Sequence, residues 1–381
     1  AEDKVVGTLG ALRPLKKQRA DRVVALMGCM VGPRTDELQQ RFPYVDVFMR
    51  PQQYGPLLDL VGQRLGLDWE GCVGSLAPAK PSVACYVPII HGCDLMCTFC
   101  IIPYRRGRQV SRPLNEVVQE VELLAQRGVK EVTLLGQTVD AYGYDLPEQP
   151  GLADLLARLN DIPELDRIRF LTSHPSFMSQ PIIQAVADLP KVCEHINLPV
   201  QAGDDEVLGR MRRPYTQAKY RELIDRIRDT VSGVSLSTDI IVGFPGETAE
   251  QFQRSLELVA DLRFNKVHCA AYSPRPGTIA FRTMADDIPL EEKVRRREQV
   301  EQLQESILRE INASLVGQDV EILVEGYNKG KWQGRTRTDK LVFFQDEGHH
   351  LGELTNVEIT QAGPWSLQGT LAARGCLSLA G

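Results

Sequence analysis

Three cysteines within one short run are the residues best suited to chemistry in this chain. Cys93, Cys97 and Cys100 stand in HGCDLMCTFC, which offers three thiolates and no fourth. Thiolates are the usual ligands of iron–sulfur clusters. A cubane cluster held by three protein ligands leaves one iron open to a substrate. In metal sites generally, such an open position is typical of a catalytic site rather than a structural one. The spacing therefore predicts a 4Fe-4S cluster with an open iron, and Phe99 supplies an apolar face beside it.

A zinc site or buried structural cysteines are the alternatives for this run. Structural zinc takes four ligands, usually in paired short spacings. The chain has no partner pair for these cysteines, although His91 could complete a zinc set. Ligand number and spacing favour the cluster.

Composition indicates a soluble intracellular enzyme. The chain has 381 residues, of which 43% are hydrophobic and 25% charged, enough for two or three domains. No apolar run approaches the length of about 20 residues that spans a membrane, and no signal-like segment opens the chain. We therefore expect a cytoplasmic protein without membrane contact. The formal net charge of -6 argues against a wholly basic nucleic-acid binder, so any such role must rest on local patches.

Apolar, β-branched runs alternate with amphipathic stretches from Ser82 onward, which is the pattern of βα units. In the helical stretch that starts at 114, Val117, Val121 and Leu124 share one face and Gly128 supplies a stop. Short βα connections favour parallel strands and right-handed crossovers, so six units predict an open (βα)6 partial barrel. The six predicted strands are 83–90, 131–136, 167–173, 195–200, 236–244 and 266–273.

The residues after these strands are the predicted ligand positions, because barrel enzymes bind at the carboxyl ends of their strands. The cysteine run follows the first strand. Gln137 and Gln201 offer amide donors and acceptors after two other strands, and Gly243 and Gly246 allow a nucleotide to approach the backbone. Ordinary polar turns are the alternative for each position taken alone.

Three domains are predicted. Residues 1–75 form a partial α/β domain in which Cys29 ends a strand at 23–29, and residues 76–315 form the partial barrel and a long charged connecting helix. Residues 316–381 show strand-like alternation and predict a small antiparallel β-barrel of the oligonucleotide-binding kind.

Basic residues mark two predicted RNA contacts. Between Lys329 and Lys340 there are five Lys or Arg and one acid. The aromatic residues Trp332, Phe343 and Phe344 lie alongside, and the combination suits phosphates and base stacking. The residues predicted to hold RNA are Arg335, Arg337 and Lys340 in this stripe, with Arg105 and Arg106 after the cysteine run. Solvated charged surfaces are the alternative in both places.

Several segments together resemble the MiaB-type transfer-RNA methylthiotransferases, which belong to the radical S-adenosylmethionine (SAM) superfamily. The resemblance is carried, in the family's order, by HGCDLMCTFC, YRRGRQVSRP, LTSHP, CEHINLPVQ, MRRPYT, STDIIVGFPGET, YSPRPGT and GRTRTDKLVFF, the last of which resembles a TRAM domain. It implies cluster-bound SAM that is cleaved to a deoxyadenosyl radical, and insertion of a methylthio group into an N-isopentenyl-type adenosine beside the anticodon. It also implies an electron donor such as flavodoxin or ferredoxin.

The chain departs from this family pattern at its start. The family resemblance implies a second 4Fe-4S cluster held by three N-terminal cysteines, and only Cys29 matches one of them here. We expect a truncated record of a longer protein. Three other functions remain open: methylthiolation of a ribosomal protein, a radical SAM reaction with a different outcome, and a non-catalytic RNA-binding remnant. The basic stripe favours RNA as the partner.

Overall fold

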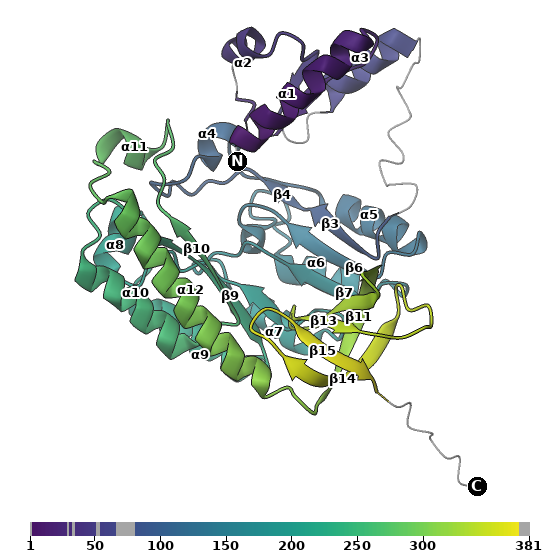
Figure 1. The fold of residues 1–381 in the computed structure, drawn as a ribbon, viewed down its shortest axis with the longest axis vertical. Coiled ribbons are helices and arrows are strands. Elements are labelled where there is room, and N and C mark those ends of the chain that lie inside the picture. The colour runs from purple at the N-terminus through teal and green to yellow at the C-terminus, as the bar shows by residue number, and fades with distance from the viewer. Residues whose placement is uncertain (1, 29, 33–34, 51–53, 66–80, 373–381) are drawn as a thin grey trace. The chain divides into compact units, whose positions relative to one another are not determined.

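A computed structural model describes residues 2–28, 30–32, 35–50, 54–65 and 81–372 (Figure 1). The chain divides into two compact units. The first unit contains residues 1–78 with 92–94 and 101–108, and the second contains the remainder.

The first unit is a small α/β body around a two-stranded parallel sheet, β1 (Ala25–Met27) and β2 (Val47–Met49). The predicted strand at 23–29 is present as β1, whereas β2 was not predicted because its three residues are too few to show a pattern. Asp46 accepts hydrogen bonds from Lys16 and from the backbone of Val24. The helices of this unit are α1 (Glu2–Gln18), α2 (Asp36–Arg41), α3 (Gly55–Leu65) and α4 (Ile102–Arg106).

All six predicted barrel strands are present in the second unit, and the open (βα)6 fold is confirmed. They form two parallel three-stranded sheets in the orders β3-β6-β7 and β10-β9-β8. An isolated parallel bridge links Ile168 of β7 to Val192, in the segment that leads into β8. The strands are β3 (Ala84–Pro88), β6 (Glu131–Leu135), β7 (Arg167–Phe170), β8 (His195–Asn197), β9 (Ser235–Val242) and β10 (Lys266–Ala271).

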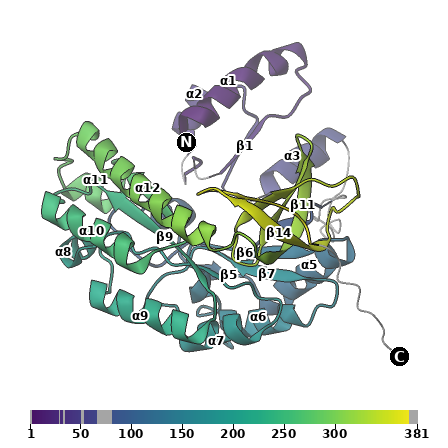
Figure 2. The ribbon, with the colours of Figure 1, turned by 60° about the horizontal axis from the view of Figure 1, so that its bottom comes forward.

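Amphipathic helices bury their apolar faces around these sheets (Figure 2). In α5, Val117 and Val121 are fully buried and Leu124 nearly so, as predicted. The long helix α12 packs against β9, β10 and α10. The helical elements are α5 (Leu114–Gln126), η2 (Val139–Ala141), α6 (Leu152–Asn160), α7 (Gln180–Asp188), α8 (Asp205–Arg210), α9 (Gln217–Thr230), α10 (Ala249–Leu262), α11 (Ile279–Thr283) and α12 (Leu290–Ala313). Among the described helices, none has both the length and the apolar character that crossing a membrane requires.

The cysteine run forms part of a loop between two short antiparallel strands, β4 (Ile90–His91) and β5 (Val110–Ser111). This hairpin was not predicted from the sequence. Ser111 donates to Asp145 and accepts from the backbone of Gly143, so β5 is fixed to the segment that follows β6.

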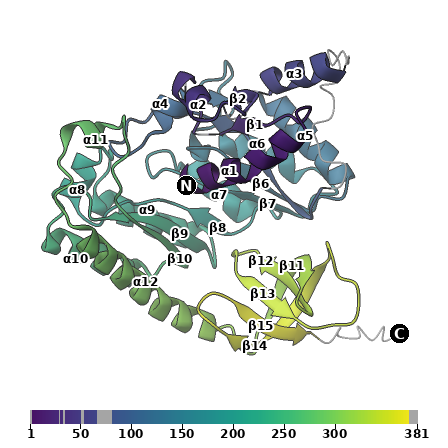
Figure 3. The ribbon, with the colours of Figure 1, turned by 45° about the horizontal axis from the view of Figure 1, so that its top comes forward.

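The C-terminal strands close into a five-stranded barrel, to which α12 leads (Figure 3). The predicted barrel is confirmed, but β13 and β15 are parallel rather than antiparallel. A closed barrel with an odd number of strands cannot alternate direction throughout, so one pair must be parallel. Trp332 and Phe344, expected to stack on RNA, are instead buried in its core. The strands are β11 (Asp319–Asn328), β12 (Lys331–Thr336), β13 (Leu341–Phe344), β14 (Leu354–Ala362) and β15 (Leu367–Leu371).

Candidate functional site

The cysteine run lies after the carboxyl end of β3, and its centre is fixed through Thr98. This side chain is buried, and its hydroxyl donates to the carbonyl of Arg210 at 2.8 Å. The Thr98 backbone N–H donates to the carbonyl of Met211 at 3.1 Å, and its carbonyl accepts from Ala280. The backbone N–H of Cys100 donates to the carbonyl of Cys97, which closes a single turn. The run is therefore anchored to the segment 210–215, which begins at the last residue of α8.

Arg213 is the side chain of that segment that reaches the predicted cluster ligands. Its Nη1 donates to the Sγ of Cys97 at 3.6 Å, while Nη2 donates to the carbonyl of Pro199 at 2.9 Å. Nε donates to the hydroxyl of Tyr215 at 2.7 Å. Burial lowers the pKa of Arg213, but Tyr215 and Cys97 raise it by more than burial lowers it. The guanidinium therefore stays charged. Sequence reasoning missed Arg213, although it stands in the MRRPYT segment.

The donor set fits an iron–sulfur cluster in its chemistry. Three thiols come from one loop, and one of them lies beside a buried cation that would stabilise its thiolate. Within the described ranges, no three His, Cys, Asp or Glu side chains are gathered as ligands of one metal ion. Thiolates of a cluster bind separate irons, so a cluster does not require that they converge on one point.

The predicted polar positions follow their strands as expected, but their surroundings differ. Gln137 is half-buried two residues after β6, and Phe99 is also half-buried. Gln201 is buried with a positive φ of 74°, an unusual conformation for a residue with a side chain. Its backbone bonds to Asp239 and Ile241 hold it against β9. Contact of these three side chains with SAM stays a prediction.

Gly243 and Gly246 share a left-handed backbone conformation but differ in the space available for a side chain. Both have positive φ values, 69° and 75°. A Cβ on Gly243 would lie 2.3 Å from Cγ of the buried Lys293, so packing within the protein excludes a side chain there. A Cβ on Gly246 would meet nothing closer than Arg210 at 3.8 Å. Of the two glycines, Gly246 is therefore the one with open space beside it, and approach of a nucleotide to either backbone stays a prediction.

A buried acid and histidine lie after β6 and β7. Oδ2 of Asp140 accepts from the backbone N–H of His174 at 2.8 Å. Among the described residues, Oδ1 of Asp140 and Nε2 of His174 have no hydrogen-bond partner. Burial raises the pKa of Asp140 to about 8 and lowers the pKa of His174 to about 3. Both groups are therefore mainly neutral at pH 7. Asp140 could not be singled out from the sequence, because its burial depends on the fold.

The protonation of Asp140 predicts a pH-dependent stability. Its folded pKa lies above the value of 3.8 for an unperturbed Asp, so the folded chain binds more protons between about pH 4 and 8 and its stability falls as the pH rises through that window. We expect Asp140→Asn to remove this dependence. The thermal unfolding midpoint of the variant, compared with that of the unaltered protein at the same pH, should therefore be higher at pH 8 than at pH 5. Thermal unfolding at these two pH values measures the effect.

Asp145→Asn is the matched control. Burial raises the pKa of Asp145, but hydrogen bonds from Ser111 bring it below its ordinary value. The ionised carboxylate therefore stabilises the fold at pH values above its unfolded pKa, and this stabilisation is lost as the pH falls through the folded pKa. Its loss should destabilise the protein at pH 8. A pH profile of Asp140→Asn identical to that of the unaltered protein would contradict the assignment of Asp140.

The residues predicted to hold RNA are placed in both units. In the first unit, Arg105 lies on α4 and donates to the carbonyl of Met30, and Arg106 ends the same helix. In the second unit, Arg335, Arg337 and Lys340 all have protein partners, which are described below. RNA contact by these five residues stays a prediction. Cys29 lies outside the described residues.

Comparison with known proteins gives two family matches. Residues 87–259 match the radical SAM superfamily, and residues 313–372 match the TRAM domain. Among solved structures, the cobalamin-dependent SAM radical enzyme OxsB with aqua-cobalamin bound has a TM-score of 0.52 at 12% identity, covering 78% of this chain and 46% of that chain. This similarity supports the fold alone.

Curated relatives cover almost the whole chain. The tRNA-2-methylthio-N(6)-dimethylallyladenosine synthase of Roseiflexus sp. (strain RS-1) is 50% identical over 98% of this chain and 79% of its own length. The protein of the same name from Herpetosiphon aurantiacus is 48% identical, over 97% of this chain and 86% of its own length. With its cysteine loop on a six-stranded partial barrel and its C-terminal TRAM barrel, the chain belongs to the radical SAM family of tRNA methylthiotransferases.

Proposed function

We propose that this protein inserts a methylthio group into an N-isopentenyl-type adenosine beside the anticodon of tRNA. One observation carries the proposal: the chain is 50% identical, over 98% of its length, to a synthase named for that product. The three-cysteine loop after β3 and the TRAM barrel support it.

Cys93, Cys97 and Cys100 would hold a 4Fe-4S cluster. When bound and reduced, such a cluster would supply the electron for cleavage of SAM, and so the radical chemistry that activates the adenosine. Thr98 fixes the position of the loop, and the Arg213 guanidinium stabilises the Cys97 thiolate. We place SAM at the carboxyl ends of the strands, where barrel enzymes bind their ligands.

The contacts with SAM and RNA complete the proposal. The residues proposed to contact SAM are Phe99, Gln137, Gln201, Gly243 and Gly246. We propose Arg105 and Arg106 as phosphate contacts, because arginine is well suited to phosphate and the two end the helix that follows the cysteine run in the sequence.

Cys29 would contribute to a second 4Fe-4S cluster, and an electron donor such as flavodoxin or ferredoxin would reduce the protein. Because tRNA resides in the cytoplasm, we place the activity there.

The test is an anaerobic reaction of reconstituted protein with SAM, a reductant and tRNA that carries isopentenyl-adenosine without the methylthio group. Liquid chromatography measures deoxyadenosine, and nucleoside mass spectrometry measures the methylthiolated product. We expect both products. Matched tRNA that lacks the isopentenyl group is the control substrate and should give less methylthiolated product.

The outcomes separate the proposed function from methylthiolation of a ribosomal protein and from RNA binding without catalysis. Deoxyadenosine with methylthiolation of a ribosomal protein, but not of tRNA, would favour the protein-modifying alternative. Binding of tRNA without any cleavage of SAM would favour the non-catalytic alternative. Either result would overturn the proposed function.

A further inference from the structure

Two arginines on one barrel strand point toward the TRAM barrel. Arg167 and Arg169 are two residues apart on β7, so both face the same side of the strand. Their side chains are almost fully buried, at 1% and 4% exposure. Charged groups are rarely buried without partners, so the contacts of these two side chains must be identified.

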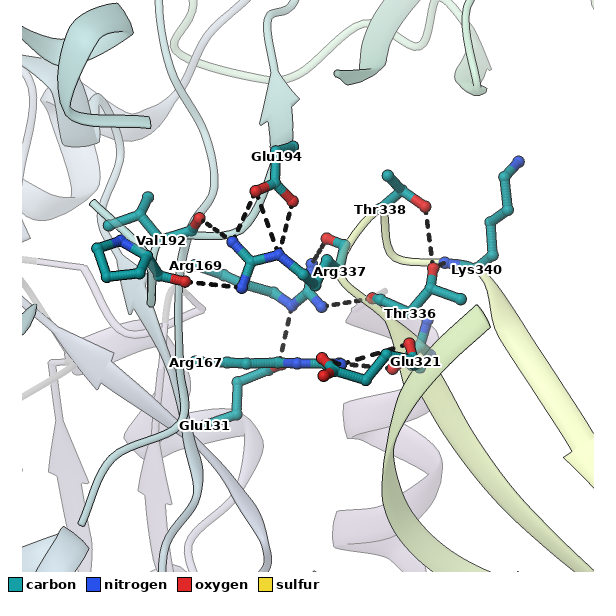
Figure 4. Close-up of polar contacts among 12 residues, drawn as sticks. Glu131, Arg167, Arg169, Val192, Glu194, Glu321, Thr336, Arg337, Thr338 and Lys340 are labelled. Atoms are coloured by element: carbon teal, nitrogen blue, oxygen red, sulfur yellow. Dashed lines mark hydrogen bonds and ion pairs between the residues drawn. The ribbon is translucent and has the colours of Figure 1, made fainter. Parts of the chain in front are cut away.

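The partners of these arginines are mostly backbone carbonyls of the TRAM domain (Figure 4). Nη1 of Arg167 donates to the carbonyl of Arg335 at 2.6 Å. Arg169 donates to the carbonyls of Thr336 and Arg337 at 2.7 and 2.6 Å, and its Nε donates to Glu131. The carbonyls of residues 335–337 thus accept from the two buried guanidinium groups.

Arg337 makes the reciprocal contact from the TRAM domain to the partial barrel. Nε and Nη2 donate to the carboxylate of Glu194, with distances down to 2.6 Å (Figure 4). Its remaining donors reach the carbonyls of Pro190 and Val192 at 2.9 and 2.6 Å. Burial raises the pKa of Glu194, but the bonds from Arg337 bring it below its ordinary value. The ion pair is therefore present at neutral pH.

The neighbouring basic side chains have different partners. Arg335 pairs with Glu325 and Asp339, both within the TRAM domain. Lys340 donates to Asn312 at the end of α12, and burial lowers the pKa of its ammonium group to about 8. Of the three residues predicted to hold RNA here, Arg337 is thus the one whose side chain bonds to the partial barrel.

The contact also shapes the interior of the barrel. A cavity of about 650 Å³ is lined by β3, by His195 and Asp239 of the inner strands, and by TRAM residues that include Gln333 and Arg335. The contacting ends of β6, β7 and β8 are their amino-terminal ends, opposite the end that precedes the cysteine loop. The TRAM domain is therefore part of the wall of this cavity.

We infer that residues 335–337 are a docking element that holds the TRAM domain against the amino-terminal end of the partial barrel, and that Arg337 is a positioning residue. Its role in tRNA recognition is indirect: it fixes the orientation of the TRAM domain and leaves phosphate contact to other residues. The docking contact stands independently of the activity, whereas the effect on tRNA rests on the proposed function.

Arg337→Ala tests the inference, with Arg335→Ala as the matched control. Both changes remove one arginine side chain from the segment 335–337, but only the side chain of Arg337 bonds across to the barrel. We expect hydrogen exchange at β7 and at residues 336–340 to rise roughly tenfold or more in Arg337→Ala, and little in Arg335→Ala. Glu194→Gln should raise exchange in the same places, and the double variant should add little to either single change.

Binding of tRNA at several salt concentrations separates docking from RNA contact. A lost phosphate contact reduces the slope of log affinity against log salt by about one, whereas undocking weakens binding without that change. We expect the KM for tRNA to rise in Arg337→Ala, while cleavage of SAM without tRNA is unchanged.

Unchanged exchange, or a slope reduced by about one, would overturn the inference and favour RNA contact by Arg337. If Arg337→Ala fails to fold, Glu194→Gln and Arg337→Lys give the same comparison, because Lys keeps the charge but not the planar fork. Absence of methylthiolation in the unaltered protein, with exchange that still rises in Arg337→Ala, would instead count against the proposed function alone.

Discussion

Replacement of Cys93, Cys97 and Cys100 by alanine should remove about four iron atoms and about four sulfides per chain from the reconstituted protein. Cleavage of SAM should then fall below detection, because no thiolate of the loop remains. The loop itself should stay in place, since Thr98 anchors it through its own hydroxyl and backbone. Iron and sulfide analysis, together with the visible absorption spectrum, measures the loss.

Cys85→Ala and Cys269→Ala are the controls for this change. Both cysteines are half-buried and lie outside the loop, so each should keep the full iron content. Iron content that is the same in the triple variant and in the unaltered protein would contradict the assignment of the cluster to this loop.

Removal of Arg213 should have the second largest effect. Its guanidinium donates to the Sγ of Cys97 and is almost fully buried. Positive charge and hydrogen bonds at a cluster sulfur raise the reduction potential. We therefore expect Arg213→Met to lower the midpoint potential by about 40 mV or more, which equals about 1 kcal/mol for one electron. Cleavage of SAM with a weak reductant should slow accordingly, and a potential titration followed by electron paramagnetic resonance measures the shift.

Arg212→Met is the matched control for Arg213, because Arg212 is the preceding residue but is exposed. Its removal should leave the potential unchanged. Arg213→Lys should give an intermediate value, since Lys keeps the charge but cannot bond to Cys97, Tyr215 and Pro199 together. A potential in Arg213→Met equal to that of the unaltered protein would show that Arg213 has only a packing role.

Periodicity and turn residues were sufficient to predict the six barrel strands. Most of these strands lie in short runs rich in apolar and β-branched residues, as in 131–136, which contains β6. The cysteine loop was equally evident, because its spacing is local. In contrast, β2 and the hairpin of β4 and β5 have only two or three residues per strand, too few to show alternation.

The roles of charged residues depended on tertiary structure. The sequence RIRFL predicts a strand, but not that Arg167 and Arg169 face the carbonyls of a domain more than 160 positions later. The sequence likewise marks Arg337 as basic without indicating that Glu194 lies within hydrogen-bond distance. A charge pattern shows the sign of a side chain and not its partner.

The sequence by itself thus determined the fold class, the cysteine loop and the family resemblance, because these depend on local spacing and on order along the chain. Only the tertiary structure placed Arg213 against Cys97 and gave Asp140 its raised pKa. It also turned Arg337 toward the partial barrel. The physical reason is common to all three: hydrogen bonding and burial depend on groups that are distant in sequence, and the packing of separate elements brings those groups together.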